Sequence, residues 1–284
     1  MKRILYFIFP LLFWACNIEE IEPLPPYVFF TNDINYYVMD MNNADPAPYI
    51  VKGTVSAEQF IKEFKMGSQT VGTDSIGDQE TRFFFEHPID VKGKTSAFDV
   101  EFTCVDSEGN IDSKPFHFIP SAPIETYVVT LGAQNNSNYG FYFSFKDRKV
   151  YSIAEFEQMP DDEGFCFGFN SAKGNPMLVS PAELINRRII NFAGSRISSF
   201  CEIVAINNQP FGKADFDAIP NDAKIRNLNG PEYGTFAFVE IGAGKTYLFK
   251  GEDTSSKGLR GMIYVQKIER GVAGYAELVI KIQK

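Results

Sequence analysis

Apolar and polar residues alternate along much of this chain, with the period of two that is typical of strands burying one face. The clearest case lies between residues 95 and 106, where every second residue is apolar: Phe98, Val100, Phe102 and Cys104. Turn-forming residues follow at 106–110, and Phe116 and Phe118 then resume the alternation. This pattern predicts a β-hairpin in this part of the chain.

Similar runs of β-branched and aromatic residues, which favour β structure, predict many more short strands. They cover residues 27–37, 49–55, 81–85, 127–132, 141–145, 165–169, 235–241, 245–250, 262–268 and 275–282. Because the chain also holds 28 phenylalanines and 13 tyrosines, the predicted fold class is mainly β.

Few helices are predicted, and most rest on a capping signal. Ser56 precedes a stretch in which Ile61 and Phe64 are spaced as on one face of a short helix. Ser152 and Glu155 have the spacing of a capping box. Two further helical segments are predicted after Ser180 and within residues 214–227.

The proline-containing stretch at residues 120–123 is typical of a linker and divides the chain into two predicted domains. Residues 27–122 carry short alternating strands with turns about every ten residues, which predicts a β-sandwich. Residues 123–284 combine strands with short helices and predict a strand-rich α+β domain.

The first sixteen residues follow a different pattern. Lys2 and Arg3 precede an apolar run over residues 4–13, which is shorter than the roughly 20 residues of a membrane-spanning helix. A positive start, a short apolar core and a small residue before the cut indicate a cleaved signal peptide, here residues 1–15.

The end of this segment, Phe13-Trp14-Ala15-Cys16, resembles the lipobox of a bacterial lipoprotein. The resemblance implies that Cys16 is acylated, for example with palmitate, and that residues 16–26 are an acidic, proline-rich tether to a membrane. The acidic residues at 19, 20 and 22 resemble the surface-export signal of Bacteroidota lipoproteins, which implies an outer-membrane protein facing the cell exterior. The alternatives are an ordinary signal peptide with an incidental cysteine, and a plain acidic linker on the periplasmic face.

Both predicted domains also resemble known ones. Residues 51–55, 83–85 and 106–110 resemble the immunoglobulin-like domain found near the N-terminus of Bacteroidota surface lipoproteins. A family of uncharacterised Bacteroidota lipoproteins has a C-terminal α/β domain that resembles residues 131–135, 149–152, 178–181, 258–265 and 274–284. That family has no established activity, so the resemblance implies no functional residues.

Charge and cysteine content narrow the function classes. Without Lys2 and Arg3 the chain keeps 25 basic and 36 acidic residues, a net charge of −11, which disfavours nucleic acid as a partner. Three cysteines follow Cys16, and for Cys166 and Cys201 both a disulfide and free buried thiols stay open. Because no cysteine or histidine spacing is typical of a metal site, no metal or other cofactor is predicted.

Catalytic motifs are also missing. Residues 242–246 end like a phosphate-binding loop, but Val239 occupies the position of the required first glycine, so a hairpin turn is predicted. His87 and His117 are the two histidines of the chain, so a Ser-His-Asp triad within residues 123–284 is excluded. Paired carboxylates at 161–163 or 215 and 217 are the remaining route to hydrolysis, and no enzyme is predicted.

Tyrosines in loops are the best candidates for a ligand site, because an aromatic face stacks on the apolar side of a sugar. Tyr139 and Tyr142 follow an asparagine-rich loop, and Tyr233 follows Asn229 and Gly230. The alternative is that these tyrosines pack at a sheet margin. Ser75, within Asp-Ser-Ile, resembles the short O-glycosylation motif of exported Bacteroidota proteins.

Together these observations predict a non-catalytic binding protein of the outer-membrane surface, with glycans as the ligand. The alternative is an adhesion or envelope-structural protein that binds another protein, and a glycan hydrolase is the third hypothesis. A cleft lined by tyrosines and amides favours the first, whereas a flat apolar patch or an open edge strand favours the second.

Overall fold

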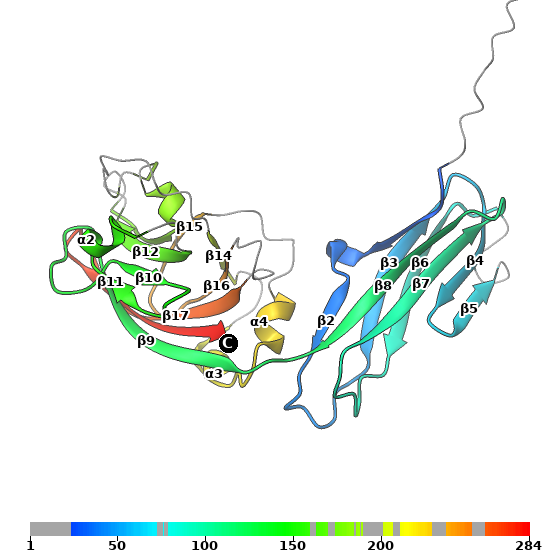
Figure 1. The fold of residues 1–284 in the computed structure, drawn as a ribbon, viewed down its shortest axis with the longest axis horizontal. Helices are drawn as coiled ribbons and strands as arrows, with labels where there is room; N and C mark the ends of the chain where they lie inside the picture. The colour runs from blue at the N-terminus through cyan, green and yellow to red at the C-terminus, as the bar shows by residue number, and fades with distance from the viewer. Residues whose placement is uncertain are drawn as a thin grey trace, which may run out of the picture.

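The computed structural model describes residues 24–72, 76, 79–159, 163–169, 174–184, 186, 187, 189, 201–206, 211–228, 237–251 and 259–284. Within these ranges the protein is mainly β, with several sheets and few helices, as the alternation of apolar residues predicts. Four sheets form two pairs, and the pairs make up what we call the N-terminal unit, residues 24–122, and the C-terminal unit, residues 123–284 (Figure 1).

The N-terminal unit consists of two facing sheets and the short 3-10 helix η1 (Thr31–Asp33). The first sheet has the order β1-β3-β6, formed by β1 (Tyr27–Phe30), β3 (Tyr49–Ser56) and β6 (Arg82–Ile89). The second has the order β2-β8-β7-β4-β5, formed by β2 (Tyr36–Met39), β8 (Ile111–Pro120), β7 (Phe98–Asp106), β4 (Ile61–Met66) and β5 (Gln69–Gly72). All described pairings are antiparallel except that of β2 with β8.

Strand alternation builds the core of this unit, as predicted. Phe102 on β7, and Phe116 and Phe118 on β8, point inward and meet Val55 and Phe85 from the other sheet. The predicted hairpin joins β7 to β8, and Gly109 adopts a positive φ of 92° in its turn. The interior is therefore a two-sheet sandwich core rich in phenylalanine.

The helix predicted after Ser56 is wrong, because residues 61–66 form strand β4. Ser56 belongs to β3 and pairs with Tyr27 and Arg82, so it caps nothing. The register of β4 against β7 shifts between Ile61 and Glu63, which is a β-bulge. The extra residue turns Ile61 and Phe64 to the same buried face, and this spacing of three mimics a helix in the sequence.

The C-terminal unit also consists of two facing sheets, both antiparallel. One has the order β11-β10-β12-β13-β15, formed by β11 (Val150–Tyr151), β10 (Tyr142–Ser144), β12 (Gly164–Phe169), β13 (Pro176–Val179) and β15 (Phe238–Glu240). The other has the order β14-β16-β17-β18-β9, formed by β14 (Cys201–Ala205), β16 (Thr246–Gly251), β17 (Arg260–Glu269), β18 (Tyr275–Gln283) and β9 (Ile124–Gly132).

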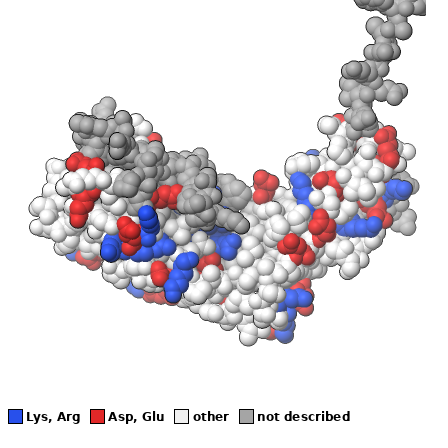
Figure 2. Space-filling model, in the orientation of Figure 1, with Lys and Arg blue, Asp and Glu red and all other residues white. Residues whose placement is uncertain are grey.

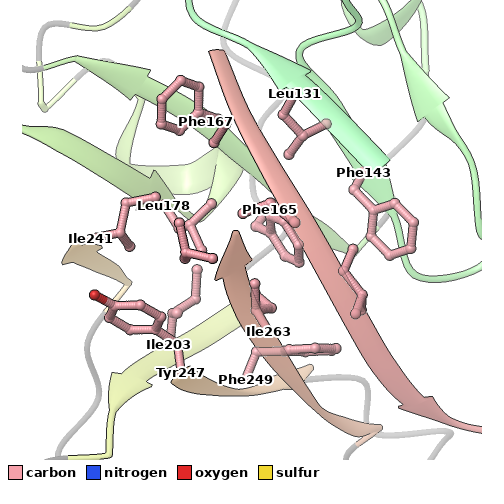
Figure 3. Packing of buried hydrophobic residues seen from close by; sticks show 14 of the residues in the cluster. Leu131, Phe143, Phe165, Phe167, Leu178, Ile203, Ile241, Tyr247, Phe249 and Ile263 are labelled. Carbon is pink, nitrogen blue, oxygen red and sulfur yellow. The ribbon is translucent and has the colours of Figure 1, made fainter. Parts of the chain in front are cut away.

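Side chains from both sheets interdigitate between them (Figure 3). Phe165 and Leu178 from one sheet lie among Ile203, Phe249 and Ile263 from the other, all fully buried. The four alternating residues of the last strand are also fully buried, as their period predicts: Ala276, Leu278, Ile280 and Ile282. This second core is separate from that of the N-terminal unit.

Short helices cover the outer faces of these sheets. Helix α2 (Ile153–Phe156) and the 3-10 helix η2 (Pro181–Glu183) contribute Phe156 and Leu184 to a cluster outside β10, β12 and β13. Helices α3 (Lys213–Asp217) and α4 (Ala223–Leu228) contribute Phe216 and Ile225 to a cluster outside β16, β17 and β18. The helices predicted in these regions are therefore confirmed.

The two serine caps differ. Ser152 and Glu155 form the predicted capping box at the start of α2. Ser180 precedes η2 but makes no side-chain cap bond there, because its hydroxyl accepts the backbone N–H of Cys201 at 3.0 Å. Ser180 thus ties the two sheets of the C-terminal unit together through its side chain, while its carbonyl accepts the N–H of Glu183 at the start of η2.

The units meet where β8 leads through residues 121–123 into β9 (Figure 1). Helix α4 lies against both β2 of the N-terminal unit and β17 of the C-terminal unit. The Asp222 carboxylate accepts the backbone N–H of Ala122 at 2.6 Å, and Asn221 donates to Asp40 at 2.6 Å. Arg260 donates to the hydroxyl of Tyr36, so hydrogen bonds fix the junction on both sides of the linker.

Candidate binding surfaces

A loop between β9 and β10 presents Tyr139, one of the predicted ligand-binding residues. The loop is organised by Asn136, whose side-chain amide donates to the carbonyls of Ala273 and Gly274 at 2.8 and 3.0 Å. The side-chain oxygen of Asn136 accepts the backbone N–H groups of Asn138 and Tyr139 at 2.8 and 3.0 Å. The side chain of Asn136 therefore holds the backbone that carries Tyr139.

Backbone contacts restrain the same loop further. The N–H of Gly132 donates to Gly140 at 2.7 Å, and the N–H of Asn135 donates to Val272 at 2.7 Å. A Cβ atom at position 132 would lie 2.8 Å from the Cβ of Asn136 and 2.9 Å from the carbonyl oxygen of Tyr139. Glycine at 132 thus permits the close approach that closes the loop.

We call the group Tyr139, Tyr275, Lys267 and Val272 the tyrosine corner. The name refers to this group alone and not to the hydrogen-bonded tyrosine of immunoglobulin-like sandwiches. The ring centroids of Tyr139 and Tyr275 are 5.1 Å apart, and 42% of Tyr139 is exposed. Lys267 donates to the Tyr275 hydroxyl at 2.5 Å, and this hydrogen bond is the main cause that raises the lysine pKa. An exposed aromatic ring therefore lies beside a lysine that stays charged at neutral pH.

The tyrosine corner lies far from the N-terminal unit. Gly132 at the end of β9 pairs with Tyr275 at the start of β18. Both strand ends lie at the end of the C-terminal unit that faces away from the N-terminal unit (Figure 1). A ligand bound here would therefore occupy the end of the molecule opposite the start of β1.

The prediction that Tyr142 binds a ligand is wrong in this structure. Tyr142 lies on β10, which pairs with β11 on one side and β12 on the other, and its side chain is fully buried. Its ring packs against Phe156 of α2, with centroids 4.5 Å apart. The alternative interpretation, a tyrosine packed against a sheet, is the correct one for this residue.

The other predicted site residues, Cys16, Ser75 and Tyr233, lie outside the described residues. Their proposed roles remain predictions. The three described cysteines, Cys104, Cys166 and Cys201, are buried thiols, and Cys166 and Cys201 form no disulfide in this structure.

A second surface, which the sequence interpretation missed, lies on the outer face of the β1-β3-β6 sheet. Phe29, Thr54 and Phe84 are neighbours across the three strands and point to the same side. Tyr27, Phe29 and Phe84 are 45%, 49% and 69% exposed. The run Phe83-Phe84-Phe85 was the available signal, because Phe85 points inward and strand alternation then turns Phe84 outward.

Two cations lie over the rings of this surface, which we call the aromatic face. The guanidinium of Arg82 is 5.0 Å from the centre of the Phe84 ring. The ammonium of Lys114 is 3.4 Å from the centre of the Tyr27 ring and 5.6 Å from that of Phe29. Such cation–π contacts hold charged groups beside an apolar patch.

The described members of the carboxylate pairs have polar partners in the structure. Asp215 accepts the N–H of Gly212 at 3.0 Å, and Asp217 pairs with Lys213. Of the acidic stretch 161–163, the structure describes Glu163 alone. His117 alternates with the buried Phe116 and Phe118 along β8, and its Nδ1 lies 2.8 Å from a carboxylate oxygen of Asp99.

The glycine-rich segment 242–246 is a turn, with Gly244 at a φ of 78°. It joins β15 to β16, but these strands belong to different sheets, so it is a crossing between sheets rather than the predicted hairpin. Its amides are already engaged, since the N–H of Gly244 donates to Val265 at 2.8 Å. No helix follows the turn, so the geometry of a phosphate-binding loop is absent from this described segment.

Two further observations concern the described residues as a whole. No group of three His, Cys, Asp or Glu side chains among them is placed to hold a metal ion. None of their helices has the length and hydropathy to cross a bilayer.

Basic and acidic side chains are interspersed over the face shown in Figure 2.

No protein-family model and no curated protein matches this sequence. Among solved structures, the chain is similar to a DUF4466 family protein from Parabacteroides merdae ATCC 43184. The similarity covers 91% of this chain and 98% of that one, with 8% sequence identity and a TM-score of 0.37. That protein comes from the Bacteroidota and its family is uncharacterised, and a likeness this distant carries neither a function nor a location to this chain.

Proposed function

We propose that this protein is a non-catalytic binding protein that binds glycans through the tyrosine corner. The observation that carries the proposal is the exposed ring of Tyr139, which lies on a loop held by Asn136 and packs against Tyr275 of β18. A tyrosine ring stacks on the apolar side of a sugar while its hydroxyl stays in water. Lys267 adds a donor for sugar hydroxyls at the edge of the pair.

Preorganisation supports this assignment. Binding a flexible polar ligand costs less when the receptor does not have to order its own loop. Four hydrogen bonds of Asn136 and two backbone bonds already restrain the loop that carries Tyr139. The corner presents two rings whose centroids lie 5.1 Å apart, so we expect it to contact one or two units of a longer glycan.

A glycan array with residues 17–284 tests the proposal. We expect saturable binding to at least one glycan, and replacement of Tyr139 by alanine should weaken it about tenfold, equivalent to about 1.4 kcal/mol. Tyr139→Phe should keep most of the affinity because the ring remains. Asn136→Ala should weaken binding even though Tyr139 is present, because the loop loses its restraint.

Phe84→Ser, on the aromatic face, is the matched control and should leave glycan binding unchanged. A blank array with protein shown to be folded by circular dichroism would reject glycan binding at the corner. Equal binding by wild type and Tyr139→Ala would reject this site but not the ligand class.

The proposed setting is the outer face of the outer membrane, with the chain tethered through acylated Cys16. The resemblance of residues 13–16 to a lipobox and the acidic residues behind them support it. Cys16→Ala should move the protein from the membrane fraction to the soluble fraction of the cell. Digestion of intact cells by an external protease separates the exterior face, where the protein is cleaved, from the periplasmic face, where it is protected.

The aromatic face favours a second candidate function, binding of another envelope protein. Exposed aromatic residues with a nearby arginine are typical of the centres of protein interfaces. The ion pair of Lys52 with Glu86, at 2.6 Å, lies next to Phe84 on the same side of the sheet and forms a polar rim. Cross-linking on cells should capture a partner with wild type, and Phe29→Ser with Phe84→Ser should lose it if this face is the interface.

A further inference from the structure

A cavity of about 200 Å³ lies in the N-terminal unit, between the loop that follows β2 and the loop between β6 and β7. Its walls include Tyr37, Met39 and Asp40 from the first segment and Lys94 and Thr95 from the second. This cavity is separate from the tyrosine corner and from the aromatic face, since it shares no residue with either.

An exposed ion pair links the two loops, and local hydrogen bonds order the first of them. Lys92 and Asp45 form an ion pair of 2.7 Å between them. Within the first loop, the N–H of Asn42 donates to Asp40 at 3.0 Å and the N–H of Asp45 donates to Asn43 at 3.1 Å. Local bonds of this kind define turns, so they order the backbone of the first loop.

The aromatic wall is also fixed. Tyr37 stacks on Tyr49, with ring centroids 4.0 Å apart and planes tilted by 24°. Burial, followed by the charge of Asp40, raises the pKa of Tyr37, so its hydroxyl stays protonated and can donate. Met39 beside it is 3% exposed and forms an apolar part of the wall.

The polar wall carries charges of both signs. One oxygen of Asp40 accepts from Asn42 and from Asn221, and its other oxygen has no protein partner among the described residues. Lys94 has no ion pair in the described part of the chain, and its ammonium lies 5.5 Å from the Phe98 ring. Asn43 adds an amide to the wall.

We propose that this cavity binds one neutral sugar unit. Ligand pockets commonly measure about 300–1,000 Å³, so this smaller space admits a single ring-sized molecule. One carboxylate and one ammonium in the same cavity favour a ligand without net charge. Sugar hydroxyls both donate and accept, so they satisfy Asp40, Asn43 and Lys94 together, while the C–H face of the ring packs on Tyr37 and Met39.

The inference does not depend on glycan binding at the tyrosine corner. The sugar can be free or can be the end of a glycan chain, because both offer the same hydroxyls. A free amino acid is the competing ligand, since its ammonium and carboxylate also match Asp40 and Lys94. The experiment therefore includes all three.

The test uses ligand-observed saturation-transfer NMR and calorimetry on residues 17–284. The probes are neutral hexoses, pentoses and N-acetylhexosamines, oligosaccharides that end in the same sugars, and a set of apolar amino acids. We expect at least one neutral sugar to bind saturably. Binding of the free sugar and of the chain end, or of the free sugar alone, distinguishes the two sources.

Ala44→Trp is the blocking variant, because Ala44 is an exposed residue of the cavity wall. Ala47→Trp is its matched control, on the same exposed loop but not in the wall. We expect Ala44→Trp to weaken sugar binding at least tenfold, and Ala47→Trp and Tyr139→Ala to leave it unchanged. Circular dichroism confirms that each variant is folded.

Three results would overturn the proposal. The first is that no neutral sugar binds to the folded protein. The second is that an amino acid binds in place of a sugar and is lost in Ala44→Trp. The third is sugar binding that persists in Ala44→Trp and disappears in Tyr139→Ala, which would support the tyrosine corner and reject the cavity.

Discussion

The side chain of Asn227 forms hydrogen bonds with both backbone groups of Val38, as a residue on a neighbouring strand would. Its side-chain oxygen accepts the N–H of Val38 and its side-chain amide donates to the carbonyl of Val38, both at 2.9 Å. Val38 lies on β2, an edge strand of the N-terminal unit, whereas Asn227 lies on helix α4 of the C-terminal unit. One side chain thus covers part of an open sheet edge and joins the two units.

Asn227→Ala should therefore weaken the junction. The substitution leaves both backbone groups of Val38 to water, and we expect a loss of about 1 kcal/mol in the free energy of unfolding. Urea denaturation measures this loss, and hydrogen exchange at the Val38 amide should become faster. Lys224→Ala, on the exposed side of the same helix, removes a contact with Phe211 but should leave exchange at Val38 unchanged. Unchanged exchange at Val38 in Asn227→Ala would contradict the role of this contact.

The three described thiols should be unreactive in the native protein. Burial, followed by the charges of Asp106 and Asp112, raises the pKa of Cys104 to about 12, and burial also raises that of Cys166. Because the thiolate is the reactive form, native residues 17–284 should resist a thiol reagent at pH 8. All three should react in denaturant. A single reactive thiol in denaturant would instead reveal a bond between Cys166 and Cys201.

Gly261→Ala should destabilise the C-terminal unit. A Cβ atom there would lie 2.2 Å from the Phe249 ring and 2.6 Å from the carbonyl oxygen of Lys281, so both a ring and a backbone would have to move. We expect a loss of about 3 kcal/mol in unfolding free energy, measured by denaturation. In Gly242→Ala the new Cβ would lie 3.6 Å from Cγ of Lys245, which is an ordinary contact. This substitution should change stability by less than about 0.5 kcal/mol.

The capping box of α2 should make stability depend on pH. Hydrogen bonds from the hydroxyl and then the backbone N–H of Ser152 lower the pKa of Glu155. Because the pKa of Glu155 is lower in the folded than in the unfolded protein, its charge stabilises the fold at pH values above the unfolded-state pKa of about 4.3. This stabilisation is lost as the pH falls through the lower, folded-state pKa. Glu155→Gln should therefore melt below wild type at pH 7.

The same comparison at acidic pH provides the check. The difference in melting temperature between wild type and Glu155→Gln should shrink once the carboxyl is protonated in the wild type. Glu157→Gln, at the C-terminal end of the same helix, is the matched control and should follow wild type. A difference that stays constant from neutral to acidic pH would contradict the assigned cause.

Much of the fold follows from local pattern, and the failures have identifiable physical causes. The alternation in β7, β8 and β18 predicts their buried faces, because those strands have regular registers over long stretches. The bulge in β4 imitates helical spacing and produced the wrong helix. Tyr142 follows the same polar loop as Tyr139, and only the pairing of β10 on both sides distinguishes the buried ring from the exposed one.

The candidate surfaces divide in the same way. Tyr139 was accessible to sequence reasoning because a polar loop precedes it. Its partners could not be predicted, because Lys267 lies on β17 and Tyr275 on β18, more than a hundred residues later in the chain. The cavity beside Tyr37 also needs two distant loops, whose approach is set by the sandwich and by the ion pair of Lys92 with Asp45.

The pairing of β9 with β18 has a mechanical consequence. A pull between the N-terminal unit and a ligand held by Tyr275 enters β9 at Ile124 and leaves through β18 at Tyr275, which pairs with Gly132 at the other end of the ladder. All nine residue pairs that join β9 to β18 are then loaded together in shear, instead of opening one after another like a zipper. The C-terminal unit is thereby built to resist stretching along the line that joins the N-terminal unit to the tyrosine corner.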